Sequence, residues 1–308
     1  MPVVRGQFDH YLRPGARKVF VDDYNELPAI YPTIFNIETS GKAYVDDLVA
    51  TGMPIAVDRP EGNPIAMDRP KFRARVRYLH TGFGLGYEIT REAVRDDVYG
   101  ALNSKSAANL ARSMREAEEV TAHAVLNNAF TTQLAYDGVA LISTAHLGVD
   151  ALTFTNRPAA DADLSTTTLK GSLERFFDLR TDRDLKVNIM PTKVLVPIQV
   201  WFNALEILQT QVITTTLAVE GVESTRADNV ISRQGLVPHK SQYLTDVDAW
   251  FTMVDTGARS YPLNFFWRDK PEDVGGFDAR EQIAWFGIIA RFVAGATEWR
   301  GIDGSTGA

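Results

Sequence analysis

Cysteine is absent from the 308 residues of this chain. Its absence excludes disulfide bonds, thiol nucleophiles and metal sites with cysteine ligands. Long apolar runs are missing as well, since no uninterrupted stretch approaches the roughly 20 residues that a membrane-spanning helix needs. We therefore predict no membrane contact. The first residues form no apolar signal segment, so we expect assembly in the cytoplasm of the cell that makes the chain.

An excess of positive charge is also lacking. The chain has 32 Lys and Arg against 39 Asp and Glu, a formal net charge of −7. A dedicated nucleic-acid-binding domain normally has a basic surface, so this balance argues against one. Hydrophobic residues make up 45% of the chain, which is enough for a sizeable core. The length suggests about two domains, or one domain with large excursions.

The motifs of common active sites are not found. The chain has no G-x-S-x-G, H-E-x-x-H or phosphate-loop pattern. Glu119 and His123 lie four residues apart on a predicted helix, but we interpret them as a solvated pair in preference to an ion site. The other histidines are scattered at positions His10, His80, His146 and His239. We predict no catalytic residue, no metal and no cofactor. A soluble α/β enzyme with an unrecognised site remains the alternative from another class.

A duplicated heptapeptide is the most unusual feature that is present. Residues 54–60 read Pro-Ile-Ala-Val-Asp-Arg-Pro, and residues 64–70 repeat them with Met in place of Val. Residues 71–78 then alternate basic and apolar side chains, which predicts a strand with two different faces. A long hairpin bounded by prolines cannot bury itself well. We therefore expect residues 39–82 to lie on another molecule.

Charged residues of this hairpin are the candidate contact residues. The basic face of the strand can meet acidic groups across the ribbon or across an interface. A merely solvated basic face is an equally good interpretation. The candidates are Lys71, Arg73, Arg75 and Arg77 on the strand, with Asp58 and Asp68 in the two heptapeptides.

Three glycines, Gly82, Gly84 and Gly86, follow the strand with G-x-G-x-G spacing. This spacing does not match the dinucleotide-binding pattern G-x-G-x-x-G. Since glycine permits positive φ, we predict a hinge here between the strand and the next helix. Close packing of the backbone is the alternative.

The rest of the chain predicts a mixture of helices and strands. Pro14, Gly15, Pro28 and Pro32 are expected to limit any helix in residues 1–38 to about three turns. The aromatic residues of this arm must pack on the chain's own domain or on a neighbour. A short helix begins after Thr90, which is a good N-cap, and a long helix of roughly 39 Å is predicted over residues 106–131.

Beyond the long helix the pattern is mixed α/β. We predict a helix after Ser165 near 166–180, a buried strand at 193–196, and a helix from Pro197, at its first position, to Leu208. Residues 211–233 are polar and predict a surface loop. Further strands are predicted at 248–254, 263–268 and 282–290.

This order of segments resembles the HK97-like fold of tailed-phage major capsid proteins. Residues 38–44 (ETSGKAY) resemble the entry to that family's E-loop. Residues 82–92 (GFGLGYEITRE), followed by Asp96-Asp97, resemble the junction between E-loop and spine helix in Mu-type major head proteins. Residues 248–251, 264–268 and 291–292, with 299–301, resemble the C-terminal strands of the same group. The resemblance covers nearly the whole chain.

The resemblance implies an α+β fold with four parts. These are an N-terminal arm (1–38), an E-loop (39–82), a discontinuous P-domain with a long spine helix (83–132 and 246–308) and an A-domain (133–245). It implies a structural protein whose pentamers and hexamers close an icosahedral head around double-stranded DNA, with weak and non-specific contact to the DNA. An encapsulin-type nanocompartment shell is the alternative within the fold.

Two departures from the family pattern matter. Some members crosslink an E-loop lysine to a neighbour, but residues 54–70 contain no lysine, so crosslinking is not expected. Many members carry an N-terminal scaffolding segment, whereas this chain reaches the E-loop within about forty residues. We therefore expect a separate scaffolding protein, in addition to a portal.

Overall fold

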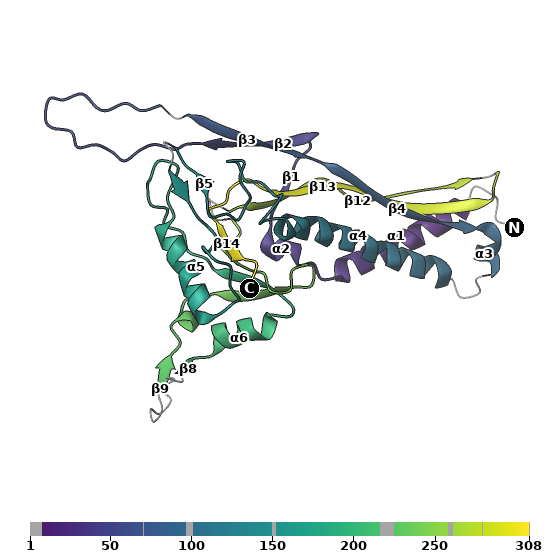
Figure 1. The fold of residues 1–308 in the computed structure, drawn as a ribbon. Helices are drawn as coiled ribbons and strands as arrows, with labels where there is room; N and C mark the ends of the chain where they lie inside the picture. Colours follow the sequence, from purple (N-terminus) through teal and green to yellow (C-terminus); the bar gives the residue numbers. More distant parts are fainter. Residues whose placement is uncertain are drawn as a thin grey trace. The chain divides into compact units, whose positions relative to one another are not determined.

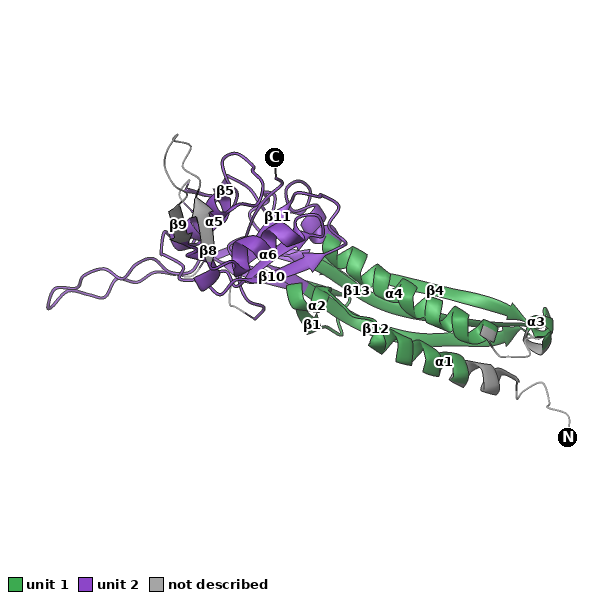
Figure 2. Cartoon of the chain, turned by 90° about the horizontal axis from the view of Figure 1, so that it is seen from below, with its two compact units in different colours: residues 1–45, 78–123, 265–294 green, residues 46–77, 124–264, 295–308 purple. Residues whose placement is uncertain are grey.

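A computed structural model gives the fold of the chain. It describes residues 8–69, 71–96, 101–149, 152–215, 225–257, 261–278 and 280–307. The chain forms two compact units, coloured separately in Figure 2. Unit 1 comprises residues 1–45, 78–123 and 265–294, and unit 2 comprises residues 46–77, 124–264 and 295–308. Each unit is therefore assembled from segments that are distant in the sequence.

Unit 1 combines long helices with a four-stranded sheet. Its sheet has the strand order β1-β12-β13-β4, which makes β4 an edge strand. Its strands are β1 (Asn36–Thr39), β4 (Thr81–Thr90), β12 (Leu263–Asp278) and β13 (Ile283–Ala296). Its helices are α1 (Phe8–Glu26), α2 (Tyr31–Ile34), α3 (Arg91–Asp96) and α4 (Ala101–Asn127). Stacked aromatic rings form its core, among them Tyr31 on Phe265 and Phe83 on Phe292.

The helices after β4 confirm the sequence prediction. α3 begins where expected, and the amide of Ala93 donates to Oγ1 of Thr90 at 3.3 Å. The long helix α4 has 27 residues and starts five residues earlier than predicted. At 1.5 Å per residue it is about 40 Å long. It runs alongside the long strands of unit 1 (Figure 2).

The N-terminal arm differs from the prediction. α1 has 19 residues and continues through Pro14 and Gly15. A proline inside a helix removes one hydrogen bond, but tertiary contacts can offset this cost. Here Phe20 is buried, its ring stacks on Tyr24 one turn later, and Tyr24 donates to Glu118 of α4 at 2.6 Å. The aromatic residues at 20, 24, 31 and 35 thus pack within their own unit, while the side chains of Phe8 and Tyr11 lie outside the described part.

The predicted glycine hinge is a regular strand in this structure. Gly82, Gly84 and Gly86 belong to β4 and pair with Arg291, Ile289 and Gly287 of β13. None of the three has a positive φ. A side chain at Gly86 would meet the carbonyl oxygen of Phe286 at 3.0 Å, so close packing requires glycine there. Close packing of the backbone, the alternative interpretation, therefore applies to Gly86. Reorientation of the chain about these glycines remains a prediction.

Unit 2 contains a second four-stranded sheet with the order β10-β7-β11-β14. β10 and β7 are parallel, and the other pairs are antiparallel. The sheet consists of β7 (Lys193–Pro197), β10 (Val237–Ser241), β11 (Trp250–Met253) and β14 (Ile302–Ser305). Its other elements are the ribbon of β2 (Tyr44–Ala50) and β3 (Phe72–Leu79), the pair β5 (His146–Leu147) and β6 (Thr153–Phe154), the pair β8 (Val212–Thr215) and β9 (Thr225–Asp228), the helices α5 (Thr166–Asp178) and α6 (Trp201–Gln209), and the 3-10 turn η2 (Ile231–Arg233).

The core of unit 2 lies between this sheet and its two helices. Val194, Val196 and Trp250 of the sheet are fully buried against Leu169 of α5 and Ala204 of α6. α5 begins as predicted, with Ser165 and Thr168 forming a reciprocal capping box. Such a rigid core provides the support from which the more exposed parts of the unit extend.

Two predictions for unit 2 are wrong in detail. Pro197 ends β7, and α6 begins four residues later, because the buried run before it continues the sheet through the proline. Residues 211–233 are not a simple loop, since they contain β8, β9 and η2. The middle of that segment, 216–224, lies outside the described residues.

The two units group the segments differently from the four expected parts. Unit 2 holds residues 124–264 together with the C-terminal strand, although 246–264 and 295–308 were expected with the spine helix. β11 pairs with β7 and β14 pairs with β11, which brings both strands into the second sheet. Boundaries between the functional parts of the chain remain a prediction.

Candidate assembly surface

A long loop joins β2 to β3, and its described residues are 52–69. None of these residues belongs to a helix or a strand. The loop turns between the two heptapeptides, where Gly62 has a φ of 85° and the amide of Asn63 donates to the carbonyl of Pro60 at 3.2 Å. The two copies therefore form two arms that run in opposite directions, and the loop extends well past the β2–β3 ribbon (Figure 1).

Aliphatic side chains of both arms are exposed to solvent. The exposed fractions are 75% for Ile55, 73% for Val57, 67% for Ile65 and 91% for Met67. The arms enclose a shallow cleft of about 440 Å³ lined by these four side chains and their neighbours. Contiguous exposed apolar surface is typical of an interaction site, and long structureless loops in compact proteins are usually functional.

The basic residues of β3 mostly have partners in their own chain. Arg77 makes a bidentate ion pair with Asp46 of β2, at 2.7 and 2.8 Å. Arg75 is more distant from the same carboxylate, at 3.9 Å. The sequence left open whether the basic face meets acidic groups across the ribbon or across an interface. Arg77 meets Asp46 across the ribbon.

The remaining candidates divide into bound and exposed residues. Asp68 of the second heptapeptide accepts a hydrogen bond from Arg183 at 2.8 Å. Asp58, at the equivalent position of the first copy, is exposed, as is Lys71 at the base of the loop. Among the described residues, the second heptapeptide is thus tied to the rest of its unit by this ion pair, and the first makes none.

Arg73 anchors the base of the loop to the rest of unit 2. Its Nη2 donates to the carbonyl oxygens of Leu147 at 2.6 Å and Gly148 at 3.2 Å, and its Nε lies 3.5 Å from the carboxylate of Asp182. Only 18% of the Arg73 side chain is exposed. This contact positions β3, and with it the start of the long loop.

Asp182 belongs to a buried polar cluster that sequence reasoning missed. Its carboxylate accepts hydrogen bonds from Arg300 at 2.6 Å and from the hydroxyl of Tyr136 at 2.7 Å. Burial lowers the pKa of the Arg300 guanidinium, but the charge of Glu298 and the neighbouring Tyr136 and Asp182 more than offset that effect, so the pKa is raised. These residues come from three distant segments, and no spacing in the sequence marks them.

A second missed cluster fixes the N-terminal arm within unit 1. Glu119 of α4 accepts the amides of Ile30 at 2.5 Å and Tyr31 at 3.2 Å, at the start of α2. Its side chain is 1% exposed, and that of His123 is 0% exposed. Our interpretation of a solvated Glu119–His123 pair is therefore wrong, because α1 and α2 cover this face of α4. Burial raises the pKa of Glu119, although the two amides act in the opposite direction.

The described residues contain no group of three or more His, Cys, Asp or Glu side chains suited to a metal ion. They also include no helix that is long and apolar enough to cross a membrane.

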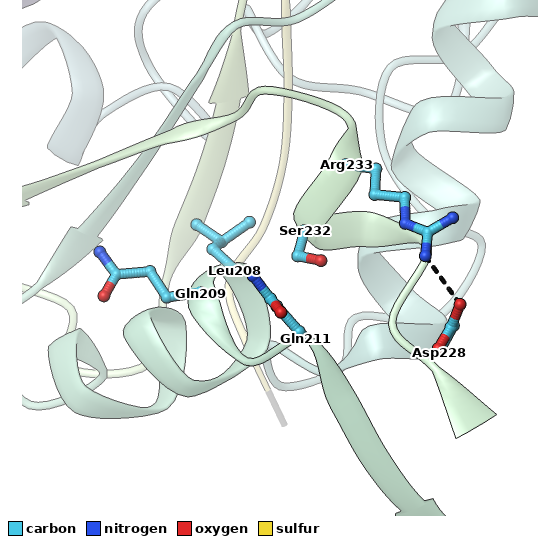
Figure 3. Close-up of a pocket in the computed structure, with 6 residues that line it drawn as sticks. All are labelled: Leu208, Gln209, Gln211, Asp228, Ser232 and Arg233. Atoms are coloured by element: carbon cyan, nitrogen blue, oxygen red, sulfur yellow. Dashed lines mark hydrogen bonds and ion pairs between the residues drawn. The ribbon is translucent and has the colours of Figure 1, made fainter. Parts of the chain in front are cut away.

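One cleft of about 500 Å³ lies beside the end of α6 (Figure 3). Its charged groups, Arg233 and Asp228, neutralise each other at 2.7 Å. The rest of the lining is Leu208, Gln209, Gln211 and Ser232. The lining contains one hydroxyl and no histidine, so it does not provide a nucleophile with an adjacent base. The exposed apolar loop is the more distinctive surface of the chain.

Family comparison identifies the class of protein. The family model described as phage capsid protein matches residues 76–302, which is more than half of the chain. The chain therefore belongs to this family of structural proteins. No curated protein sequence matches it significantly.

Solved capsid structures show the same fold. The procapsid protein of bacteriophage JBD30 is 14% identical, with a TM-score of 0.55 over 99% of this chain and 77% of that one. The capsid protein of the native GTA particle is 10% identical, with a TM-score of 0.58 over 92% of each chain. The capsid protein of cyanophage P-SCSP1u is 10% identical, with a TM-score of 0.58 over 91% of this chain and 88% of that one. The predicted HK97-like α+β fold is confirmed.

Proposed function

We propose that this chain is a major capsid subunit, which self-assembles through pentamers and hexamers into the icosahedral head of a tailed phage. Membership of the phage capsid family carries this proposal. The fold shared with the JBD30 and GTA capsid proteins supports it independently of sequence identity. Its place of action is the virion, after assembly in the host cytoplasm.

The long loop is the proposed contact between subunits. It exposes Ile55, Val57, Ile65 and Met67, which no part of the described chain covers. Burying one such side chain on a neighbour contributes about 1.5–3 kcal/mol. A closed shell repeats this contact in every subunit, so a modest contribution per copy suffices for a stable assembly. Asp58 and Lys71 are the exposed charges that we assign to the same contact.

We assign double-stranded DNA to the interior of the shell. The subunit carries a net charge of −7, so it attracts DNA phosphates only weakly, and contact with packaged double-stranded DNA is non-specific. We assign scaffolding and portal functions to separate proteins. In the same scheme unit 1 with α4 corresponds to the peripheral domain, and the larger part of unit 2 corresponds to the axial domain.

Assembly of the purified protein, expressed with its scaffolding protein, tests this function. Electron microscopy should show hollow shells or rings of five and six subunits. DNA that is protected from nuclease inside shells made during infection would support a phage head, whereas protein cargo would indicate a nanocompartment. A small oligomer that never assembles at any salt concentration would contradict the proposal.

A loop variant tests the assigned contact separately. Replacing Ile55, Val57, Ile65 and Met67 together with Ser should abolish shells. Each substitution should change the free energy of unfolding by no more than about 0.5 kcal/mol, because each side chain is already solvated. Leu134→Ser with Val247→Ser is the matched control, since both are about half exposed elsewhere in unit 2. Normal shells from the loop variant would show that the contact lies elsewhere.

A further inference from the structure

His146 on β5 is fully buried and has an acceptor at each ring nitrogen. Its Nδ1 lies 2.8 Å from Oδ2 of Asp137, and its Nε2 lies 3.0 Å from Oδ1 of Asn156. The ring also stacks on Trp299, with centroids 4.3 Å apart and planes within 3°. In the sequence, neither a neighbouring motif nor the spacing to other histidines distinguishes His146 as a functional residue.

The orientation of Asn156 is fixed by its other contacts. Its Nδ2 faces the carbonyl oxygens of Leu141, Trp299 and Ile302, at 2.8, 3.2 and 3.0 Å. Its Oδ1 accepts the amide of Ser143 at 2.8 Å. Rotating the amide by 180° would place oxygen against three carbonyls. The atom that faces Nε2 of His146 is therefore an acceptor, and Nε2 must carry a proton.

The Asp137 carboxylate is ionised for a similar reason. It accepts the backbone amides of Val139 at 3.2 Å and Leu147 at 3.1 Å, in addition to facing Nδ1 of His146. Burial raises the pKa of Asp137, but the hydrogen bond and positive charge of His146 outweigh burial and lower it below its usual value. The 2.8 Å contact between Nδ1 and Oδ2 requires a proton between the two atoms, and a carboxylate that already accepts two amides leaves that proton on Nδ1. Both ring nitrogens therefore donate, which makes His146 an imidazolium.

This pair supports the anchor of the long loop. Asp137 holds the amide of Leu147, and the carbonyl oxygens of Leu147 and Gly148 receive Arg73 of β3. The other charged groups around the network are Asp182, which also faces Arg73, and Arg300, whose guanidinium lies 4.5 Å from the Trp299 ring centroid. Glu298 pairs with Arg300 at 2.8 Å. All of these residues belong to unit 2.

We propose that His146 and Asp137 form a proton-dependent latch, which closes the Arg73 anchor when His146 is doubly protonated and opens it when His146 loses a proton. A neutral ring would direct a lone pair at an acceptor oxygen at 2.8 or 3.0 Å. Segment 146–148 must then move, and the two carbonyls that hold Arg73 move with it. The base of the β2–β3 ribbon is then held less firmly, by the contact of Arg73 with Asp182 and by the ion pair of Asp68 with Arg183. Only the consequence for shell assembly rests on the proposed function.

The acid limit of the latch follows from Asp137. Asp137 has a lowered pKa in the folded chain. Its contribution is therefore complete above the pKa of an unfolded aspartate, and is lost only when the pH falls through the lowered value. The latch thus stays closed in acid until Asp137 is protonated.

The unassembled full-length subunit provides the test. The ¹⁵N shifts of the His146 ring should show two protonated nitrogens at the acid end of a titration from about pH 5 to pH 8. Amide hydrogen exchange of β3, expressed as protection factors, should fall about tenfold as the second proton leaves, the effect of losing one hydrogen bond to a charged group. His239→Gln is the control, because this histidine lies on β10 outside the network, and it should leave the change intact.

Two variants distinguish the latch from ordinary burial. His146→Phe keeps the stack on Trp299 but has no donor, so β3 should be poorly protected at every pH. If that variant does not fold, Asp137→Asn decides, because it removes the carboxylate charge, and turning its amide nitrogen toward Nδ1 would take from the Leu147 amide the acceptor that Oδ2 provides. Its β3 protection should then be independent of pH. A singly protonated His146 throughout, or β3 protection that ignores both pH and Asp137→Asn, would overturn the latch. Neither result depends on whether the subunit forms shells.

Discussion

The N-terminal segment 8–35 and the long loop 52–69 contain similar ingredients, yet they behave differently. Both are interrupted by prolines and carry many apolar side chains. The first forms α1 and α2 and packs into unit 1, whereas the second has no secondary structure and exposes its apolar side chains. Proline content therefore does not decide which segment folds. The available partners decide it.

The partners of the N-terminal segment are visible on α4. Phe20 and Tyr24 are spaced by one helical turn, so both face the same helix. Glu118 and Glu119 then accept the hydroxyl of Tyr24 and the amides of Ile30 and Tyr31. Burial of large aromatic rings offsets the cost of a proline inside the helix. The segment thus has both apolar burial and polar anchors.

The long loop has neither type of anchor over most of its length. Its apolar residues are aliphatic and lie in two short runs, 54–57 and 64–67, each followed by a charged Asp-Arg pair. Within the described residues, the first heptapeptide makes no ion pair with the rest of the unit, and the second makes one, from Asp68 to Arg183. A second subunit supplies the missing partner under the proposed function. The contrast is therefore between a segment that finds its surface in the same chain and one that requires a neighbour.

Removing the polar anchor of the N-terminal segment should give the largest effect, because this segment would then lose the contacts that distinguish it from the long loop. Glu119→Ala leaves the buried amides of Ile30 and Tyr31 without their acceptor, at a cost of about 2–4 kcal/mol. The segment should then resemble the long loop in its hydrogen exchange and protease sensitivity. Urea unfolding measures the loss of stability. Glu116→Ala, on the exposed side of the same helix, is the control and should change stability by no more than about 0.5 kcal/mol. Equal effects of the two variants would show that the anchor is unimportant.

The glycine strand β4 is an intermediate case that sharpens the comparison. Its backbone is regular, but Gly82, Gly84 and Gly86 give it few side chains to bury. Gly86→Ala places Cβ 3.0 Å from the carbonyl oxygen of Phe286 and 3.1 Å from Cα of Gly287, and should cost about 1–3 kcal/mol. Gly82→Ala meets nothing within 4 Å and should be neutral or slightly stabilising. Thermal melting of the unassembled subunit compares the two.

The same pair of variants examines the hinge hypothesis. If these glycines serve as a hinge, Gly82→Ala should leave melting unchanged but arrest shells at an immature diameter, which electron microscopy detects. Full-sized shells from Gly82→Ala would leave close packing at Gly86 as the only role that these substitutions support.

Regular elements with strong local signals were predictable from the sequence. The Thr90 cap, the long helix α4 and the Ser165 cap are local, and each is present in the structure. The continuous α1 was not predictable, because its stability comes from α4, which lies about ninety residues away. The buried clusters around Glu119, Asp182 and His146 were missed for the same reason: their members are brought together only by the fold. The exposed loop was predictable because its prolines and its duplicated heptapeptide are features of the segment itself.

The ion pair at the base of the loop should give the smallest effect, and it tests whether the basic strand belongs to the subunit or to an interface. Arg77 and Asp46 form two short hydrogen bonds, but 41% of the Arg77 side chain is exposed. Solvent screening limits such a pair to about 0.5–1 kcal/mol. A double-mutant cycle with Arg77→Gln and Asp46→Asn, followed by urea unfolding, should recover that coupling. Arg75, whose nearest contact to Asp46 is 3.9 Å, should show almost none in the same cycle and is the matched control. If Arg77→Gln also prevents shells while Arg75→Gln does not, the pair orients the loop for assembly. If Arg75→Gln alone prevents shells, the exposed arginine contacts the neighbouring subunit directly.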